Sequence, residues 1–115
     1  MIDYLQILET DRDYQDRNSE VQHIAMNLHR FTGNTKIPIV AASQLKRLEG
    51  NPTLADLREG GNQEAEAEKV ILIDNPPTED ESPTRNAFLI VAKNKDGKLG
   101  RVPVTFNGAH MRFEQ

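Results

Sequence analysis

The chain has 115 residues, with 14 Lys plus Arg against 18 Asp plus Glu, a formal net charge of −4 and no cysteine. The lack of cysteine excludes a disulfide scaffold and thiolate catalysis, and the acidic balance argues against binding nucleic acid by bulk charge alone. No apolar run approaches the ~20 residues that cross a bilayer, and the N-terminus lacks the features of a signal peptide. We therefore expect at most one domain, in a cytoplasmic protein with no membrane partner.

The first part of the chain predicts two short strands separated by a helix. Residues 1–8 (MIDYLQIL) are mostly apolar and predict a strand. Ser19 predicts a helix N-cap, because apolar residues follow it at spacings of three and four. The pair Gly33-Asn34 predicts the end of this helix, and residues 36–43 (KIPIVAAS) predict the second strand.

Residues 53–85 predict a partly helical segment, a strand and a loop in turn. Residues 53–69 combine Ala, Leu and Glu and predict partial helix, interrupted at Gly60-Gly61. Residues 70–73 predict a buried strand. Residues 75–85 hold three prolines and an acidic cluster, which predicts a flexible loop.

The last part predicts antiparallel strands. Residues 87–92 (AFLIVA) predict a strand, Asp96-Gly97 a hairpin turn, residues 102–106 the returning strand and residues 110–113 a final short one. With the strand–helix–strand order before it, this pattern predicts an α/β fold. We expect a mainly parallel sheet with a C-terminal antiparallel hairpin at one edge.

Two polar residues at strand ends are candidates for nucleotide chemistry. Asp3 lies near the end of the first predicted strand, where an acid can hold Mg²⁺, often through water. Gln44 follows the second predicted strand, where an amide could sense a γ-phosphate or orient water. From the residues alone, an ordinary terminal acid and an ordinary strand-end amide are the more frequent interpretations.

Two further segments could contact phosphate. Residues 55–61 (ADLREGG) place Arg58 and Glu59 before two glycines, which suits a loop that contacts phosphate groups but also fits an ordinary charged helix end. Lys93 and Lys95 lie with Lys98 in a predicted hairpin turn, where a solvated loop is the more frequent interpretation and a basic finger that reaches a phosphate is the functional one. The phosphate-binding loop GxxxxGK[ST] does not occur in the 115 residues.

Taken in order, these segments resemble one family. Residues 2–6 (IDYLQ), 36–45 (KIPIVAASQL), 55–61 (ADLREGG) and 88–102 (FLIVAKNKDGKLGRV) are similar to the C-terminal half of the RecA-like ATPase domain of DnaB-type replicative DNA helicases. The closing FNGAHMRF is like the last strand of that domain. The resemblance covers nearly the whole chain and implies a partial RecA-like, P-loop NTPase sheet over residues 1–115.

The resemblance implies a role for each candidate. Asp3 would be the Walker B acid that supports Mg²⁺ in a complete site, and Gln44 the γ-phosphate sensor. The DNA-contacting loop would hold Arg58, Glu59 and Gly61, and the finger that reaches the nucleotide of the next subunit would hold Lys93 and Lys95.

The sequence differs from the family pattern at residues that the family uses for ATP hydrolysis and DNA contact. Lys95 stands where the family has its finger arginine, and lysine keeps the charge but loses the bidentate fork. Gly60 replaces a serine, and Ala65 replaces a glutamine. The family's catalytic glutamate and phosphate loop would both lie before Met1.

The resemblance implies a fragment or truncated member of the helicase family, whose parent reaction is ATP-dependent DNA unwinding. We expect no ATPase activity and no cofactor for the chain alone, with Mg²⁺ and ATP used in the parent family. Binding of single-stranded DNA should be weak or absent. Self-association or a helicase subunit could cover the edge of the first strand. The alternatives are a non-catalytic interaction or regulatory module derived from a helicase domain, and a related RecA-like ATPase such as a recombinase paralogue.

Overall fold

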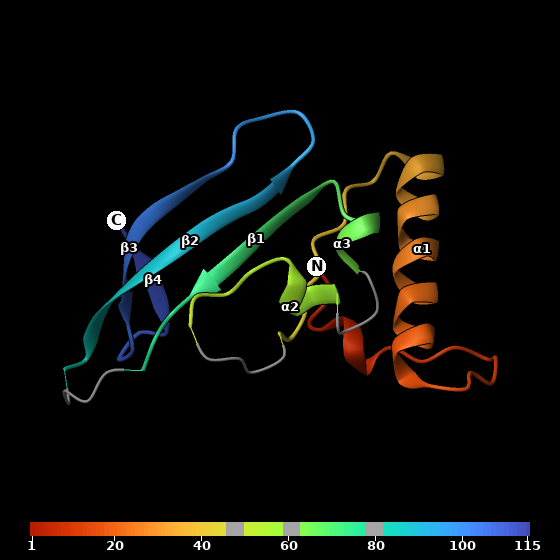
Figure 1. Ribbon diagram of the computed structural model, residues 1–115, viewed down its shortest axis with the longest axis horizontal. Helices are drawn as coiled ribbons and strands as arrows, with labels where there is room; N and C mark the ends of the chain where they lie inside the picture. The colour runs from red at the N-terminus through yellow and green to blue at the C-terminus, as the bar shows by residue number, and fades with distance from the viewer. Residues whose placement is uncertain (46–49, 59–62, 78–81) are drawn as a thin grey trace. The chain divides into compact units, whose positions relative to one another are not determined.

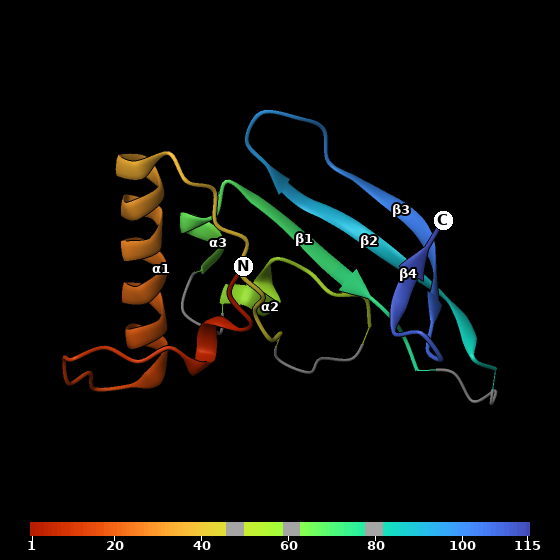
Figure 2. The ribbon, with the colours of Figure 1, turned by 180° about the vertical axis from the view of Figure 1, so that it is seen from behind.

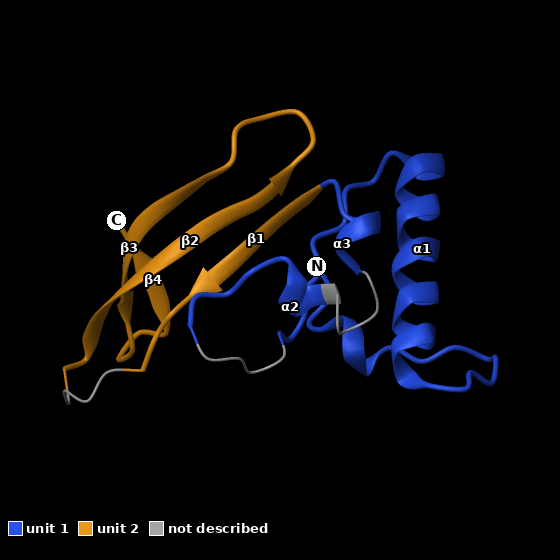
Figure 3. Ribbon diagram, viewed as in Figure 1, with its two compact units in different colours: residues 1–68 blue, residues 69–115 orange. Residues whose placement is uncertain are grey.

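The computed structural model describes residues 1–45, 50–58, 63–77 and 82–115. The chain divides into two compact units, Met1–Glu68 and Lys69–Gln115 (Figure 3). The first unit holds the helices and the second holds a four-stranded sheet (Figure 1). No helix among the described residues is both long enough and apolar enough to cross a membrane.

Helix α1, Arg17–Thr35, dominates the first unit. Its N-cap is Asp16, whose Oδ1 accepts from the Ser19 amide at 2.9 Å and whose Oδ2 accepts from the Ser19 hydroxyl at 2.7 Å. The bond from the Ser19 amide holds the pKa of Asp16 below its ordinary value. The prediction of Ser19 as the cap is therefore wrong: an aspartate three residues earlier takes that role and uses Ser19 as its partner.

The helix also ends later than predicted. Gly33 and Asn34 remain helical, and Lys36 ends α1 in the left-handed conformation (φ 60°), with its amide bonded to Thr32 O at 2.9 Å. Pro38, two residues further on, supplies a physical reason for the stop, because the residue before a proline disfavours helix.

The first predicted strand is not a strand. Ile2 forms one parallel bridge with Ala41, and Leu5–Ile7 then turn into a short 3₁₀ helix, η1. The chain bends because the Ile7 amide bonds to Tyr4 O and the Leu8 amide to Leu5 O, both local bonds in place of a ladder. The Asp3–Tyr4 peptide bond is cis. The second predicted strand, residues 36–43, is reduced to the same single bridge.

Two short helices follow, α2 at Ala55–Arg58 and α3 at Gln63–Glu66, which confirms partial helix in this region. The interruption predicted at Gly60-Gly61 lies outside the described residues. Helix α1 packs against η1 and α3, and α2 packs against α3. The buried apolar side chains of this unit are Leu5, Val21, Ile24, Ala25 and Leu57.

The sheet of the second unit is antiparallel throughout, in the order β1-β2-β3-β4 (Figure 2). Its strands are β1 Lys69–Asp74, β2 Thr84–Asn94, β3 Gly100–Asn107 and β4 Arg112–Glu114. The prediction of a mainly parallel sheet is therefore wrong. Among the described residues parallel pairing is confined to the Ile2–Ala41 bridge, whereas each neighbouring strand pair of this sheet runs antiparallel.

The strands of the second unit confirm the predicted hairpin and the final strand. Strand β1 alternates exposed and buried residues, with Val70, Leu72 and Asp74 on the buried face. Strand β4 is held to β3 by Phe106 and Phe113, whose ring centroids lie 5.1 Å apart in register. Part of the predicted flexible loop 75–85 is described, and its residues 78–81 lie outside the described ranges.

Truncation of Val21 tests the core of the first unit. Val21 is 1% exposed, so Val21→Ala should lower the free energy of unfolding by about 2 kcal/mol through lost burial and a residual cavity. The neighbouring Gln22 is exposed, and Gln22→Ala is the matched control. Denaturant unfolding followed by the helical circular dichroism signal measures both, and equal midpoints for the two variants would contradict this packing.

Candidate functional site

Asp3 and Gln44 lie on two segments that pair directly. The Ile2 amide bonds to Val40 O at 2.8 Å, the Ala42 amide to Ile2 O at 2.8 Å, and the Leu5 amide to Ala42 O at 2.9 Å. Asp3 follows the bridge residue Ile2, and its side chain is exposed. Asp3 therefore lies within this short parallel pairing, and Gln44 lies two residues beyond its last backbone bond at Ala42.

Gln44 is held by a residue that the sequence analysis did not single out. The side-chain Oε1 of Gln6 accepts from the Gln44 amide at 3.2 Å, and Nε2 of Gln6 donates to Gln44 O at 3.1 Å. Gln44 itself is exposed. A glutamine inside the apolar run MIDYLQIL was the available signal, because a polar group among apolar neighbours needs hydrogen-bond partners.

The same amide reaches a second residue. Nε2 of Gln6 donates to Ser43 Oγ at 2.9 Å, and the Ser43 hydroxyl donates to Oε1 of Gln63. Gln63 is the first residue of α3 and is only 5% exposed. Three polar side chains, Gln6, Ser43 and Gln63, therefore join three separate segments of the first unit.

Arg17, at the start of α1, holds the backbone around Gln6. Its Nη2 donates to Gln6 O at 2.6 Å and to Leu8 O at 2.7 Å, and its Nη1 pairs with Glu20. Oε1 of Glu20 accepts from the Thr10 amide at 2.9 Å, and this bond, ahead of the pairing with Arg17, holds the pKa of Glu20 below its ordinary value. The planar guanidinium suits this task because it presents several donors in fixed directions.

The predicted DNA-contacting segment lies only partly within the described residues. Arg58 is the last residue of α2, and Glu59 and Gly61 lie outside the described residues. Asp56 in the same segment is 5% exposed, and its Oδ2 accepts from the Thr53 amide at 2.6 Å and the Thr53 hydroxyl at 3.1 Å. Asp56 therefore anchors the start of this segment.

Lys93 and Lys95 belong to the second unit. Lys93 lies near the end of β2, and Lys95 is exposed in the turn that follows. The β1–β2 register contains a bulge: Val70 pairs with Lys93 but Ile71 pairs with Val91, so Ala92 is the extra residue. Because of the bulge, Lys93 lies opposite Val70, whereas Val91 two residues earlier lies opposite Ile71 on the other face.

The turn after β2 brings Gly97 close to the side chain of Asn94. A Cβ at Gly97 would lie 2.4 Å from Nδ2 of Asn94, the same atom that donates to Lys98 O at 3.3 Å. A larger residue at position 97 would therefore require the Asn94 side chain to shift, and the end of a flexible side chain can do so at little cost.

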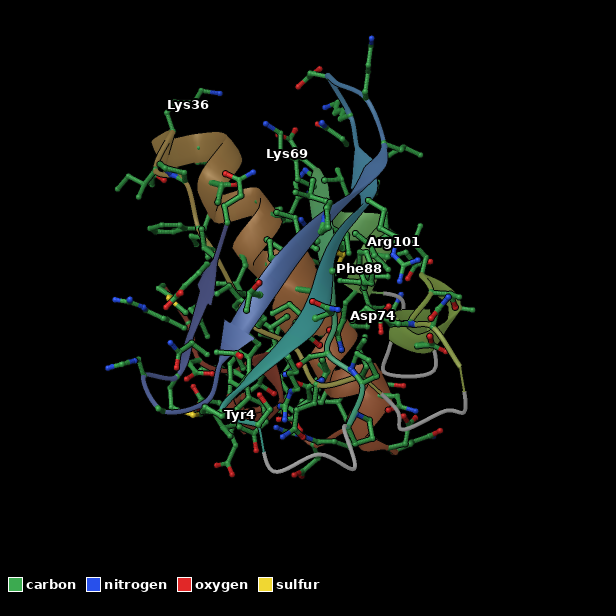
Figure 4. The ribbon with its side chains drawn as sticks, turned by 90° about the vertical axis from the view of Figure 1, so that its left-hand side faces the viewer. Tyr4, Lys36, Lys69, Asp74, Phe88 and Arg101 are labelled. Carbon is green, nitrogen blue, oxygen red and sulfur yellow. The ribbon has the colours of Figure 1, made fainter. Side chains whose placement is uncertain are left out.

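A charged cluster lies on the buried face of the sheet. Asp74 is 7% exposed, and its Oδ2 accepts from Nη2 of Arg101 at 2.8 Å. Cζ of Arg101 lies 3.5 Å from the centroid of the Phe88 ring (Figure 4). Asp74 is buried and Arg101 is partly exposed, and the two contacts of Arg101 link β3 to β1 and to β2.

The described residues limit what metal the site could hold. Within residues 1–45, 50–58, 63–77 and 82–115, no three His, Asp or Glu side chains gather as a potential metal cage. Mg²⁺ in phosphate sites is commonly held by one or two carboxylates, with waters and the substrate phosphates as the other ligands. The exposed single carboxylate of Asp3 fits that kind of site and does not fit an all-protein cage.

Comparison with known proteins decides the family. The family model described as the DnaB-like helicase C terminal domain matches residues 1–115, the whole chain. The chain belongs to this family. The family assigned from the sequence motifs is confirmed.

Curated relatives support the assignment. The "Replicative DNA helicase DnaB" of Leifsonia xyli subsp. xyli is 33% identical over 120 residues, covering 98% of this chain and 26% of the relative. The protein of the same name from Haemophilus influenzae is 31% identical over 121 residues, covering 99% of this chain and 26% of the relative. The chain thus spans about a quarter of the length of these relatives.

Solved structures agree with the sequence relatives. A DnaB-like replicative helicase, described with its interactions with primase, superposes with a TM-score of 0.83 at 28% identity, covering 98% of this chain and 29% of that one. A second solved structure, described as an ATPase domain, superposes with a TM-score of 0.84 at 30% identity, covering 98% and 42%. The RecA-like part of the predicted fold class is therefore supported at the level of helicase ATPase domains.

The Glu20 contacts generate a pH prediction. The folded pKa of Glu20 lies below its unfolded value, so its stabilising contribution is present above the ordinary glutamate range and is lost as the pH falls through the folded pKa. Glu20→Gln removes the titrating group. The melting temperature of the parent chain should exceed that of the variant near neutral pH, and the difference should shrink in acid.

Glu9 is the matched control for this prediction, because it is an exposed glutamate in the same part of the chain. Glu9→Gln should leave the pH dependence of the melting temperature unchanged. A Glu20→Gln difference that stays constant between neutral pH and about pH 3, below the ordinary glutamate range, would contradict the Thr10 and Arg17 contacts.

Proposed function

We propose that these 115 residues supply the Walker B, sensor and finger half of a DnaB-type helicase motor, and that they do not hydrolyse ATP by themselves. The observation that carries the proposal is the pairing of residues 2–5 with residues 40–42, which places Asp3 and Gln44 on adjacent segments. The parent reaction is ATP hydrolysis coupled to translocation on single-stranded DNA.

Each residue has a distinct part in this proposal. The carboxylate of Asp3 would hold Mg²⁺ through water, and the bound ion would neutralise charge that develops on the phosphates. The amide of Gln44 would contact the γ-phosphate. The ammonium groups of Lys93 and Lys95 would contribute positive charge to the nucleotide of a neighbouring subunit.

DNA contact is proposed for the segment that includes Arg58, Glu59 and Gly61. The net charge of −4 gives no general attraction to phosphate. We propose that contact with single-stranded DNA needs several copies of this segment in an assembled ring, and that binding by one chain is weak and sensitive to salt. Self-association or pairing with a helicase subunit would supply that assembly.

The first test is ATPase activity with and without a phosphate-loop half. The purified 115 residues should show no Mg²⁺-dependent ATPase above a contaminant control, because they contain no GxxxxGK[ST]. Joined to the phosphate-loop half of a relative's ATPase domain, they should support hydrolysis. Asp3→Asn should then reduce the rate at least about a hundredfold, and Asp13→Asn, an exposed acid elsewhere, should not.

Two outcomes would count against this proposal. Hydrolysis by the 115 residues alone would refute their dependence on a phosphate-loop half. Stable binding to a helicase subunit without any restored hydrolysis would favour the alternative of a non-catalytic interaction or regulatory module, which Lys95 in place of the family's arginine also favours.

The second test concerns the finger. In the joined protein, Lys95→Arg should raise the rate of ATP hydrolysis by about tenfold or more, because arginine adds a bidentate fork where lysine offers a point charge. Lys98→Arg, three residues further along the same exposed loop, is the matched control and should have no effect. Equal rates for the Lys95→Arg variant and the parent would remove Lys95 from the finger role.

A further inference from the structure

The side chain of Gln6 continues the pairing of two segments past the point where their backbones separate. The last backbone bond runs from the Leu5 amide to Ala42 O at 2.9 Å. From Leu5 onward the chain turns into η1, so its peptide groups no longer face residues 43 and 44. The carboxamide of Gln6 then donates to Gln44 O at 3.1 Å and accepts from the Gln44 amide at 3.2 Å.

This pair of bonds has the chemistry of a peptide group. A primary amide offers one carbonyl acceptor and two N–H donors, so Gln6 can satisfy both backbone groups of Gln44 at once. The second N–H of the same amide remains available for Ser43 Oγ, at 2.9 Å. One side chain thus fixes the backbone on which the side chain of Gln44 is carried.

The second branch leads to α3. The Ser43 hydroxyl accepts from Gln6 and donates to Gln63, a 5% exposed residue at the first position of α3. Helix α3 begins two residues after the end of the ADLREGG segment in the sequence. The Gln6–Ser43–Gln63 bonds are partly buried, and satisfied polar side chains of this kind fix the segments that they join.

The backbone of Gln6 is itself fixed. Arg17 Nη2 donates to Gln6 O at 2.6 Å and to Leu8 O at 2.7 Å, on either side of the turn. Charge-assisted bonds of this kind are about twice as strong as neutral ones. The backbone that carries the Gln6 carboxamide is therefore held by bonds that do not involve Gln44.

We propose that Gln6 is a positioning residue, which sets the backbone of Gln44 and, through Ser43, ties it to the start of α3. The importance of Gln44 and of the segment before α3 rests on the proposed function above. The physical role of Gln6 rests only on its contacts with Gln44, Ser43 and, through Ser43, Gln63. Gln6 would thus be shared by the candidate nucleotide-sensing and DNA-contacting parts of the first unit.

Amide hydrogen exchange, followed by nuclear magnetic resonance on the 115 residues, tests this role. Gln6→Leu should accelerate exchange of the Gln44 amide by about tenfold, the effect of losing one net hydrogen bond. It should also accelerate the Ala67 amide, which bonds to Gln63 O at 3.3 Å in α3. Gln22→Leu, at an exposed glutamine of α1, is the matched control and should change neither.

Two further variants separate the branches. Gln6→Glu keeps an acceptor for the Gln44 amide but loses the N–H donors, so Gln44 should stay protected while the Ala67 amide exchanges faster. Ser43→Ala should likewise accelerate Ala67 and leave the Gln44 amide unchanged. Protection of the Gln44 amide in Gln6→Glu, together with its loss in Gln6→Leu, would not be expected if both variants simply lowered the stability of the fold.

The results that would overturn the proposal are specific. An unchanged Gln44 exchange rate in Gln6→Leu would do so, and so would an equal acceleration of the α1 amides of Ile24 and Ala25, because that would indicate a general loss of stability. The experiment uses neither nucleotide nor DNA. Failure of the ATPase test would therefore leave the Gln6 result standing, and failure here would leave the ATPase test untouched.

Discussion

The parallel pairing of residues 2–5 with residues 40–42 is the constraint on which the candidate site depends. Its backbone bonds join chain segments that are far apart in sequence, and the amide of Gln6 extends the contact to Gln44, 38 residues away. Forming such long-range contacts carries an entropic cost that local bonds do not. The contacts of Arg17 and Glu20 with residues 6–10 reduce the freedom of one partner segment and so lower that cost.

The two units obtain their order in different ways. The second unit is built from hairpin neighbours, so its ladders connect residues that are close in the chain, and the pairs Phe106–Phe113 and Asp74–Arg101 add side-chain contacts. The first unit has one long helix, a single parallel bridge and a set of polar side-chain links. Its candidate residues consequently depend on side-chain hydrogen bonds far more than on a regular sheet.

The sequence predicts the second unit better than the first, because the second unit is built from local pairing and the first from contacts between distant segments. Strand β1, the hairpin and β4 are predictable because a short apolar run, alternation at 102–106 and an Asp-Gly turn are local signals, although Ile71 and Ile73 of the predicted buried strand are exposed. Helix α1 is predictable in its apolar face but not at its ends, since Asp16 caps the helix with Ser19 as its bonding partner and Lys36, beyond Gly33, takes the left-handed conformation that ends it. The short apolar runs at 1–8 and 36–43 predict strands but form a single bridge. A short apolar run becomes a strand only where a neighbouring segment pairs with it, and the run itself does not show that partner. The motifs point to Asp3, Gln44 and the lysines as candidates that the structure does not test, whereas Gln6 becomes a candidate only through its hydrogen-bond partners.

The bulge at Ala92 has a consequence for protein engineering. In a regular strand, residues 91 and 93 would lie on the same face of the sheet. The extra residue Ala92 breaks this alternation, so that Lys93 lies on the face of its partner Val70 and Val91 lies on the opposite face with Ile71. Transfer of the lysine-bearing turn at residues 93–98 to another protein should therefore keep residues 89–97 together, without insertion or deletion. A deletion or insertion of one residue before Lys93 would move the Lys93 side chain to the other face of the strand, even though the lysine motif itself would be intact.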